Sequence, residues 1–337
     1  MADEAVEIEA AGRTFSVSNP NKVYFSERGE TKLDLVRYYL AVEEPLMRAL
    51  GGRPILMERY PEGAGGPSFF QKRVPKNAPG WLETTTVETP NGTPSQALVA
   101  ADVLHIVWAV NIGCLGLHVW PYLAADPEHA DELRIDVDPS PGVTFEMVRE
   151  AASEVRSFLA ELGMEGAPKT TGRNGIHIYV RLTPEQDSYM VRAAAVALAR
   201  ELERRRPDLI TAAWWKEERG RRVFIDFNQN APHKTVLGAW SVRPRVGGQA
   251  STPFRWDELE TIVPDELTLA TVPARVAADG DPWEATIAAP QSLEPLLELH
   301  RRDMDAGMMD APWPPVYPKM PNEPARVAPS RARKTEA

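Results

Sequence analysis

Apolar and polar positions along the first third of the chain predict both strands and helices. Residues 1–20 alternate weakly, which predicts a hairpin at a sheet edge, whereas apolar residues spaced roughly 3.6 positions apart from Thr31 onward predict a helix. Residues 53–63 (RPILMERYPEG) read as a strand that enters a loop, and residues 68–100 are rich in Pro, Thr and Gly, which favours further strands and loops. Residues 101–125 predict a buried helix followed by a strand.

The middle of the chain has the clearest pattern. Residues 133–138 (LRIDVD) alternate as a strand that ends at the turn PSPG. A helix is predicted from about Thr144 to Leu162. Thr144 is its expected N-cap, because a hydroxyl there can accept a hydrogen bond from a free backbone N–H, and Gly163 is its expected stop.

Further segments continue this order of strands and helices. Residues 168–175 (PKTTGRNG) read as a loop and residues 176–182 (IHIYVRL) as a strand. A helix over Pro184–Arg205 leads to another strand at residues 221–227 (RRVFIDF), and the chain beyond about Pro253 is acidic and helical. The elements indicate an α+β fold.

The organisation of the chain predicts one large domain followed by a tail. No internal repeat is visible, and no linker stands out before residue 310. We therefore expect a single domain over residues 1–310. Residues 311–337 form a Pro-rich, partly basic tail that we expect to be mobile or draped over the surface.

Composition limits the classes of protein that fit. The chain has 337 residues, 43% hydrophobic and 26% charged, which is typical of a globular protein. No apolar run approaches the roughly 18 residues of a membrane helix, and the acidic N-terminus does not resemble a signal peptide. With Cys114 as the only cysteine, we expect a cytoplasmic protein without disulfides. The net charge of −10 argues mildly against nonspecific coating of nucleic acid.

Two carboxylates on the predicted strand 133–138 are the strongest candidates for chemistry. Because side chains alternate along a strand, Asp136 and Asp138 share one face. Two ionised carboxylates so placed repel each other unless a cation neutralises them, and Mg²⁺ or Mn²⁺ prefers such oxygen ligands. A bare Asp-x-Asp pair is common in surface strands, but this pair ends an apolar strand where a turn opens the sheet edge.

A third carboxylate, Asp226, lies in the apolar strand predicted over residues 221–227. It needs a partner, which is either a neighbouring arginine or a metal ion shared with the Asp-x-Asp pair. In the second case the three acids would form a site for two metal ions that activates a hydroxyl and stabilises a leaving group.

Candidate phosphate-binding groups lie between and after these acids. Gly172 and Gly175 permit tight turns close to an anion, and Lys169 to Arg173 supply donors. Taken alone, this segment is more simply a hairpin loop with a satisfied histidine, His177. Lys234, Arg243 and Arg245 follow Asp226, where they would suit a nucleotide triphosphate or merely balance the acidic charge.

Five motifs in order, LHVWPY, RIDVDPSPG, KTTGRNGIHIYV, RVFIDFNQN and KTVLGAWSVR, resemble the polymerase domain associated with bacterial ATP-dependent DNA ligases. This family belongs to the archaeo-eukaryotic primase-polymerase superfamily and works in non-homologous end joining. The likeness covers about residues 18–260 and extends to NPNKVYF and ERYPEGAGGPSFFQK. It implies a catalytic core of two mixed or antiparallel β-sheet modules flanked by helices, in a stand-alone member.

The resemblance also implies roles for individual residues. Asp136, Asp138 and Asp226 match the metal-binding catalytic acids. Two further groups match the contacts to the incoming nucleotide and to DNA. The nucleotide group contains His118, Thr171, Gly172, Arg173, His177, Arg222, Lys234 and Arg243. The DNA group contains Phe69 and Phe70, which would stack on the template, and Lys22 and Lys32, which would grip a 5′-phosphate.

Two positions depart from the family's pattern. Glu58 stands where a basic residue usually precedes the Arg-Tyr/Trp-Pro of its loop, and an anion there would oppose a phosphate. Asn174 replaces a common lysine, which weakens triphosphate binding unless Arg173 substitutes.

The function implied is a template-directed DNA/RNA polymerase that fills short gaps and extends ends in DNA repair, with NTPs preferred over dNTPs and Mn²⁺ or Mg²⁺ as cofactor. The expected partners are DNA with gaps or ends, a Ku protein and a separate ATP-dependent DNA ligase, on the bacterial nucleoid and away from membranes. Two alternatives stay open: a two-metal phosphodiesterase or nuclease, and a catalytically silent module that bridges DNA ends.

Overall fold

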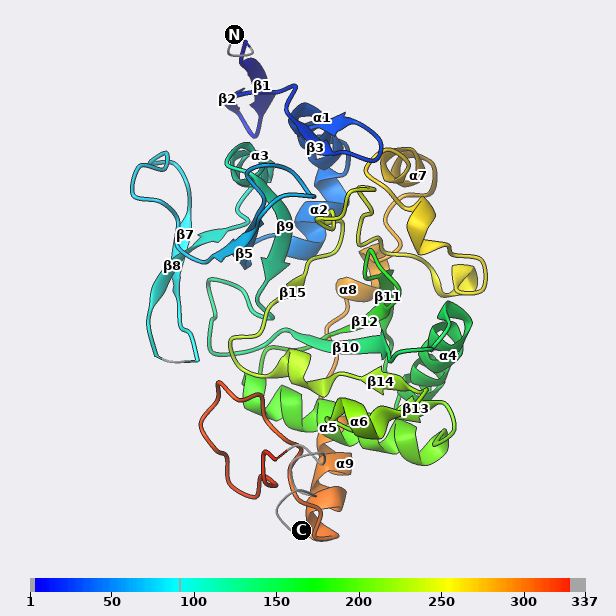
Figure 1. The fold of residues 1–337 in the computed structure, drawn as a ribbon. Coiled ribbons are helices and arrows are strands. Elements are labelled where there is room, and N and C mark those ends of the chain that lie inside the picture. The colour runs from blue at the N-terminus through cyan, green and yellow to red at the C-terminus, as the bar shows by residue number, and fades with distance from the viewer. Residues whose placement is uncertain (1–3, 91, 328–337) are drawn as a thin grey trace, which may run out of the picture.

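A five-stranded sheet forms the lower half of the molecule in Figure 1, which shows the computed structural model; it describes residues 4–90 and 92–327. The strand order is β11-β12-β10-β14-β13, and only the pair β13–β14 is parallel. The sheet is therefore mixed, with β10 at its centre. The strands are β10 (Glu132–Pro139), β11 (Ala167–Thr170), β12 (Ile176–Arg181), β13 (Ile210–Thr211) and β14 (Val223–Ile225).

A six-stranded antiparallel sheet forms the second module, with the order β15-β9-β5-β8-β7 and with β6 paired to β5. Its strands are β5 (Pro54–Arg59), β6 (Phe69–Gln71), β7 (Thr84–Val87), β8 (Ser95–Val99), β9 (Cys114–Val119) and β15 (Val236–Leu237). Two hairpins complete the strands, β1 (Val6–Ala10) with β2 (Arg13–Val17) and β3 (Val23–Phe25) with β4 (Glu30–Thr31). The predicted α+β core of two sheet modules is confirmed. The predicted N-terminal hairpin forms, but as a separate two-stranded sheet and not at the edge of a larger one.

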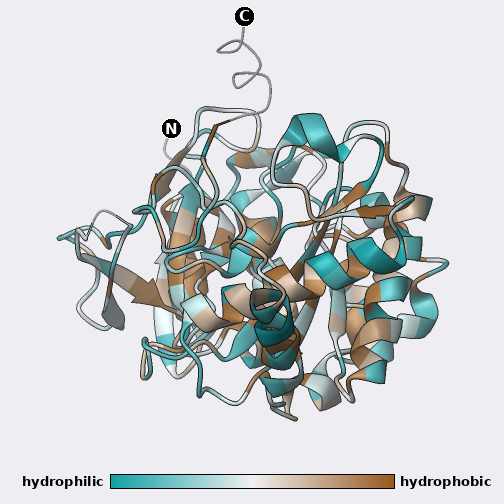
Figure 2. Cartoon of the chain, turned by 90° about the horizontal axis from the view of Figure 1, so that it is seen from below, coloured by the Kyte–Doolittle hydropathy of each residue, from teal (hydrophilic) through white to brown (hydrophobic). Residues whose placement is uncertain are grey.

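Helices flank both sheets and bury their apolar residues against them. Figure 2 shows hydrophilic (teal) and hydrophobic (brown) residues mixed along these helices. They are α1 (Lys32–Ala41), α2 (Glu43–Leu50), α3 (Val103–Asn111), α4 (Phe145–Glu161), α5 (Ser188–Arg205), α6 (Lys216–Arg219), α7 (Val272–Asp279), α8 (Glu284–Ile287) and α9 (Glu294–Asp305). Three 3₁₀ helices are η1 (Phe227–Asn230), η2 (Trp256–Glu258) and η3 (Pro264–Glu266). Among the described residues, none of the helices has the length and apolar character that crossing a membrane requires.

Helix ends follow local chemistry where the sequence provides a cap. Thr144 caps α4 as predicted, because its hydroxyl accepts a hydrogen bond from the backbone N–H of Met147. α5 begins at Ser188 rather than Pro184, since Asp187 provides the cap. The single helix predicted from Thr31 is two helices that meet at Val42, because Pro45 lacks the N–H that a continuous helix would need there.

Two boundaries near the acids differ from the prediction. Part of the predicted loop 168–175 is a strand, because β11 pairs with β12 through Thr170. The predicted strand 221–227 ends at Ile225, and Asp226 instead caps η1. These changes move the polar groups of both segments to strand ends, where they face the same space.

A buried network of charged side chains joins the two sheets. The guanidinium of Arg53, directly before β5, binds both carboxylate oxygens of Asp131 at 2.7 and 2.8 Å and reaches Glu132 at 2.9 Å. Arg134 on β10 binds Glu132 at 2.9 Å, and Arg181 also pairs with Asp131. Arg53 and Arg134 are each only 1% exposed. The N-terminal end of β10 is therefore tied to the other module.

Candidate active site

The strand β10 presents two aspartates to a cleft. Asp136 and Asp138 alternate with buried Ile135 and Val137, so the predicted sharing of one face is confirmed. Asp136 lies opposite His177 of β12 in the strand register, and its Oδ1 is 3.3 Å from the Nε2 atom of His177. Both acids thus face the space beyond the carboxyl end of β10.

Asp226 reaches the same place from β14. Its backbone N–H donates to the carbonyl of Asp136 at 2.9 Å, which fixes the two residues side by side. Its carboxylate accepts hydrogen bonds from the backbone N–H of Asn228 at 3.0 Å and from the Nε2 atom of Gln229 at 2.9 Å. The three predicted acids are brought together by two neighbouring strands.

The electrostatics of these acids fit a cation. The low-dielectric surroundings of the cleft raise the pKa of Asp136 to about 6. The same surroundings, and then the charge of Asp136, raise the pKa of Asp138 to about 6 and that of Asp226 to about 7. The charge of Asp136 therefore raises the cost of ionising Asp138 and Asp226, and a divalent cation bound among the three would lower that cost.

The spacing of these side chains is looser than that of a closed metal site. Within the described ranges, no three side chains of the His, Cys, Asp and Glu types stand close enough together to hold a metal ion. The Asp226 carboxylate is instead occupied by its hydrogen bonds to Asn228 and Gln229. Small side-chain rotations would therefore accompany metal binding by Asp136, Asp138 and Asp226.

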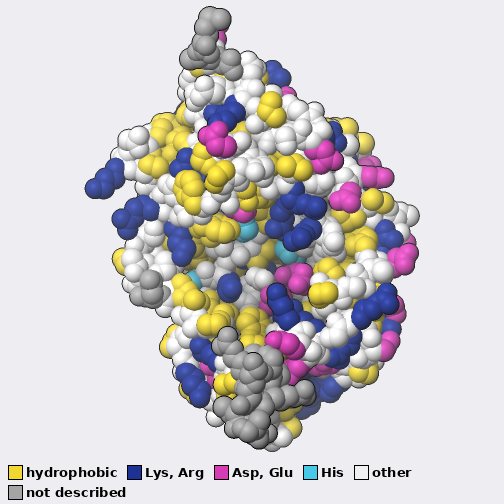
Figure 3. All heavy atoms as spheres, in the orientation of Figure 1, with side chains coloured by type: hydrophobic (Ala, Val, Ile, Leu, Met, Phe, Trp, Pro, Cys, Tyr) yellow, Lys and Arg dark blue, Asp and Glu magenta, His cyan; other side chains and the backbone are white. Residues whose placement is uncertain are grey.

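A cleft of about 590 Å³ lies in front of β10, a size that suits a nucleotide-sized ligand. In Figure 3, basic, acidic and histidine side chains gather in the hollow at the centre of this face. The cleft is lined by acids together with cations and a hydroxyl. The lining includes Asp136, Asp138, Thr171, Arg173, Asn174, His177, Lys216, Arg219 and Arg243.

Hydrogen bonds fix the conformation of the loop between β11 and β12, which lines this cleft. The hydroxyl of Thr171 accepts a hydrogen bond from the backbone N–H of Gly175 at 3.2 Å. Arg243 donates from Nε and Nη2 to the carbonyl of Thr171 at 3.1 and 2.8 Å. Gly172 has a φ of +69°, and a Cβ there would lie 3.2 Å from the Cβ of Arg243, so a larger residue would push the arginine away.

His177 is supported from behind by a buried lysine. The Nζ atom of Lys169 lies 2.9 Å from Nδ1 of His177 and also donates to the carbonyl of Leu237 and the hydroxyl of Ser251. Burial and then the Lys169 charge lower the pKa of His177. This shift favours the neutral imidazole, and if Nδ1 accepts from Lys169 the proton lies on Nε2, 3.3 Å from Oδ1 of Asp136. Lys169 itself is fully buried and is not a cleft donor.

Arg222, predicted to contact the nucleotide, points elsewhere. Its guanidinium donates to the carbonyls of Glu218 and Arg219 and pairs with Glu203 of α5 at 3.4 Å. Arg219 lines the cleft instead, with its guanidinium 3.5 Å from the ring centre of Phe224. Both arginines belong to the basic run ERGRR at residues 218–222, and of the two only Arg219 lines the cleft.

Burial raises the pKa of Asp226, and the charge of nearby Lys234 offsets part of that rise. Lys216 of α6, which sequence reasoning missed, lines the cleft beside Arg219. In the sequence, Lys216 is marked only by its position two residues before the basic run at residues 218–222. The cations that line the cleft come from three separate segments, which carry Arg173, Lys216 with Arg219, and Arg243.

His118 lies beside the cleft with an acidic partner. The Nε2 atom of His118 is 2.9 Å from the carboxylate of Glu58, which also accepts a hydrogen bond from the hydroxyl of Tyr60 at 3.0 Å. A Cβ at Gly116 would come within 2.7 Å of this carboxylate, so glycine makes room for the pair. Glu58, one of the two departures from the family pattern, is thus engaged by its neighbours.

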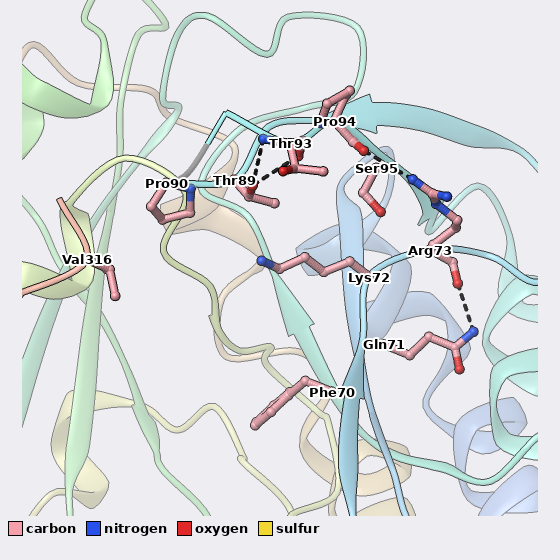
Figure 4. A pocket seen from close by; sticks show the side chains of 10 residues that line it. All are labelled: Phe70, Gln71, Lys72, Arg73, Thr89, Pro90, Thr93, Pro94, Ser95 and Val316. Carbon is pink, nitrogen blue, oxygen red and sulfur yellow. Dashed lines mark hydrogen bonds between the residues drawn. The ribbon is translucent and has the colours of Figure 1, made fainter. Parts of the chain in front are cut away.

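The predicted aromatic pair is exposed. Phe69 and Phe70 of β6 are 48% and 60% exposed, which argues against core packing. Phe70 lines a pocket of about 800 Å³ with Lys72, Arg73 and Val316, and Figure 4 shows the Lys72 side chain extending across this space.

The two lysines predicted to grip a phosphate differ in setting. Lys22 is part-exposed and pairs with Glu62 at 3.2 Å. Lys32 is only 3% exposed, and its Nζ atom donates to the carbonyls of Ser18 and Asn111. Burial lowers the pKa of Lys32 to about 8. Of the two, only Lys22 offers its charge at the surface.

Comparison with known proteins agrees with this geometry. A family model described as "LigD, primase-polymerase domain" matches residues 31–283. The multifunctional non-homologous end joining DNA repair protein LigD of Mycobacterium tuberculosis is 31% identical over 317 residues, which are 92% of this chain and 42% of that protein. The bifunctional non-homologous end joining protein LigD of Bacillus subtilis is 30% identical over 82% of this chain and 44% of that protein.

The fold agrees as well. The polymerase domain of Mycobacterium tuberculosis ligase D, solved in complex with DNA, superposes with a TM-score of 0.77 and 30% identity, covering 82% of this chain and 99% of that chain. This chain spans less than half the length of the curated relatives that it matches. With more than half of its residues matched by the family model, the chain belongs to the family of the LigD primase-polymerase domain.

Proposed function

We propose that this protein is a template-directed polymerase that extends DNA ends and fills short gaps during end-joining repair, with NTPs preferred over dNTPs. The observation that carries the proposal is the cleft of about 590 Å³, which is lined by Asp136 and Asp138 together with cations and a hydroxyl. Asp226 is bound to the backbone of Asp136 beside it. The names of the relatives, and the DNA bound to the mycobacterial domain, support DNA as the substrate.

The acids define where nucleotidyl transfer would occur. Asp136, Asp138 and Asp226 are the groups that would hold Mn²⁺ or Mg²⁺, both of which prefer carboxylate oxygens. When bound, such ions lower the pKa of a primer 3′-hydroxyl and neutralise the phosphates of the incoming nucleotide. The backbone hydrogen bond between Asp226 and Asp136 keeps the acids in register for this role.

The cations and polar groups of the cleft would hold the triphosphate. Thr171 and the neutral His177 present a hydroxyl and an N–H, while Arg173, Arg219 and Arg243 present charge. Arg173 is positioned to offset the lysine that Asn174 replaces. Fixed donors of this kind position the phosphates and stabilise the charge that develops during transfer.

The exposed aromatic pair would contact the template. Phe69 and Phe70 can each stack on a base, worth about 1–3 kcal/mol per base. Lys22 is the accessible candidate for a 5′-phosphate, since Lys32 is buried and Glu58 is held by His118 and Tyr60. A Ku protein and a separate ATP-dependent DNA ligase are the partners we propose, in the bacterial cytoplasm.

A primer-extension assay on gapped DNA tests the function. With Mn²⁺, the wild-type protein is expected to add template-matched nucleotides, NTPs faster than dNTPs, and to release pyrophosphate. Omitting the divalent metal should stop the reaction. Comparing gaps with and without a 5′-phosphate then shows whether Lys22 suffices beside Glu58, because a strong preference for the phosphate requires an accessible cation.

The same assay separates the two alternatives. A two-metal nuclease would shorten the primer and release no pyrophosphate, and a silent bridging module would do neither. The cations and hydroxyl that face Asp136 and Asp138 favour binding of a triphosphate over simple hydrolysis.

Arg219 and Arg222 form a matched pair for testing the nucleotide wall. Arg219→Gln removes a charge that lines the cleft, and we expect the KM for NTP to rise roughly 10-fold, the scale of one lost charge-assisted contact. Arg222→Gln removes a charge held by Glu203, so its KM should change less than about 2-fold. Steady-state kinetics at saturating primer–template measures both, and a larger effect at Arg222 would contradict this placement.

A further inference from the structure

The C-terminal segment Asp310–Glu323 packs against the part of the chain that carries Asp226. In Figure 1 this red-orange segment lies beside α5. Ala311, Trp313 and Tyr317 are only 5%, 3% and 6% exposed, so the segment has its own buried contacts. It lies beyond residue 283, where the match to the family model ends.

Arg192 of α5 connects this segment to η1. Its Nε atom donates to the side-chain oxygen of Asn228 at 2.7 Å, and its Nη1 atom binds Asp310 at 3.0 Å. Its Nη2 atom donates to the carbonyl of Ala311 at 2.9 Å, and its guanidinium lies 3.7 Å from the ring centre of Trp313. The Arg192 side chain is only 1% exposed, and that of Asp310 is 20% exposed.

Asn228 connects the C-terminal segment to Asp226. Its side-chain amide donates to the carbonyl of Pro312 at 3.0 Å, while its side-chain oxygen accepts from Arg192. Its backbone N–H donates to the Oδ1 atom of Asp226 at 3.0 Å. Arg192 and the C-terminal segment thus bind the two ends of the Asn228 side chain and restrict the residue whose N–H binds Asp226.

The segment also holds the other end of the same turn. The hydroxyl of Tyr317 donates to the carbonyl of Pro232, two residues before Lys234. The C-terminal segment therefore binds the stretch from Asp226 to Lys234 at two residues, Asn228 and Pro232. These are buried contacts, which hold geometry more firmly than surface contacts do.

We propose that the C-terminal segment Asp310–Glu323 is part of the metal site, where Arg192 and Asn228 act as positioning residues that aim the Asp226 carboxylate. This inference rests on the proposed function, since it assigns Asp226 to a metal ion. Partners that orient a metal ligand typically change metal affinity 10- to 100-fold when they are removed.

Direct Mn²⁺ binding to the full chain, followed by the EPR signal of the free ion, tests the proposal without relying on activity. Asp310→Ala and Trp313→Ala remove contacts to Arg192 without touching the acids, and each is expected to weaken Mn²⁺ binding about 10-fold. Trp313→Phe keeps an aromatic ring over the guanidinium and should restore most of the affinity. The Mn²⁺ concentration for half-maximal primer extension should shift in parallel, with smaller changes in rate at saturating metal.

Two control variants separate positioning from stability. Val316→Ala alters an exposed side chain of the same segment and should leave Mn²⁺ binding unchanged. Leu296→Ala removes a buried side chain of α9 and should lower the melting temperature while Mn²⁺ affinity stays at the wild-type value. If Leu296→Ala lost as much Mn²⁺ affinity as Asp310→Ala and Trp313→Ala, general destabilisation would explain the loss and the proposal would be overturned.

The remaining outcomes are distinct. If the wild type binds Mn²⁺ and the folded Asp310→Ala and Trp313→Ala variants bind it equally well, the positioning role is wrong and the proposed function stands. If the wild type binds no more Mn²⁺ than a variant with Asp136→Asn and Asp138→Asn, the metal site itself fails, and the positioning role fails with it.

Discussion

Replacing Asp136 and Asp138 together by asparagine is expected to lower primer extension by roughly 10³-fold or more, the scale seen when a group that stabilises transition-state charge is removed. Asparagine keeps the size of each side chain but removes the charge that would hold the metal ions. The loss should appear in kcat at saturating nucleotide and persist at high Mn²⁺. Extension rates on a gapped primer–template measure it.

The same variant should be at least as stable as the wild type in metal-free buffer. The pKa values of Asp136 and Asp138 are raised to about 6, above their unfolded values near 3.8. The native state therefore binds more protons than the unfolded state between these limits, and stability falls as pH rises through that window. The melting temperature of the variant should equal or exceed that of wild type at pH 7.5, and the difference should shrink toward pH 4.

A control on an acid outside the cleft completes this experiment. Asp208 is 69% exposed and pairs with Arg206, so Asp208→Asn should leave extension unchanged. Extension that survives in the Asp136→Asn, Asp138→Asn variant would refute the assignment of these acids to catalysis.

Arg53→Met is expected to destabilise the protein by about 3–5 kcal/mol, because it removes the guanidinium that pairs with both Asp131 and Glu132 in a buried network. Asp131 and Glu132 are 6% and 5% exposed, so water cannot easily replace the lost guanidinium. The free energy of unfolding from urea denaturation measures the loss. Asp131 keeps its pair with Arg181 and Glu132 its pair with Arg134, which prevents a still larger effect.

Arg301 provides the matched surface control. It pairs with Glu294, and both side chains are more than half exposed. Arg301→Met should therefore change the free energy of unfolding by less than about 1 kcal/mol. A comparable loss in both variants would mean that the buried network does not contribute more than an ordinary surface pair.

Features set by local chemistry were predictable from the sequence. The alternation that places Asp136 and Asp138 on one face depends only on the geometry of a strand. The start of α4 depends on one hydroxyl, that of Thr144, and the structure confirms it. The family motifs then indicated which neighbouring segments belong to the same cleft.

Features set by tertiary contacts were not predictable in this way. Lys169 reads as a loop donor, yet pairing of β11 with β12 buries it behind His177. Arg222 and Arg219 are equivalent in the sequence, and Glu203 on a distant helix decides which one leaves the cleft. The end of β14 before Asp226 likewise depends on contacts that η1 makes with residues far along the chain.

The buried network at the start of β10 has a mechanical consequence for substrate recognition. One end of this strand is anchored to the sheet that carries Phe70 and His118, and its other end carries Asp136 and Asp138. A hinge motion between the two sheets would pull on the strand and shift the acids. We therefore expect the cleft to be stiff and preformed. A base pair of the wrong width would then displace the reacting phosphate from the position that Asp136 and Asp138 require.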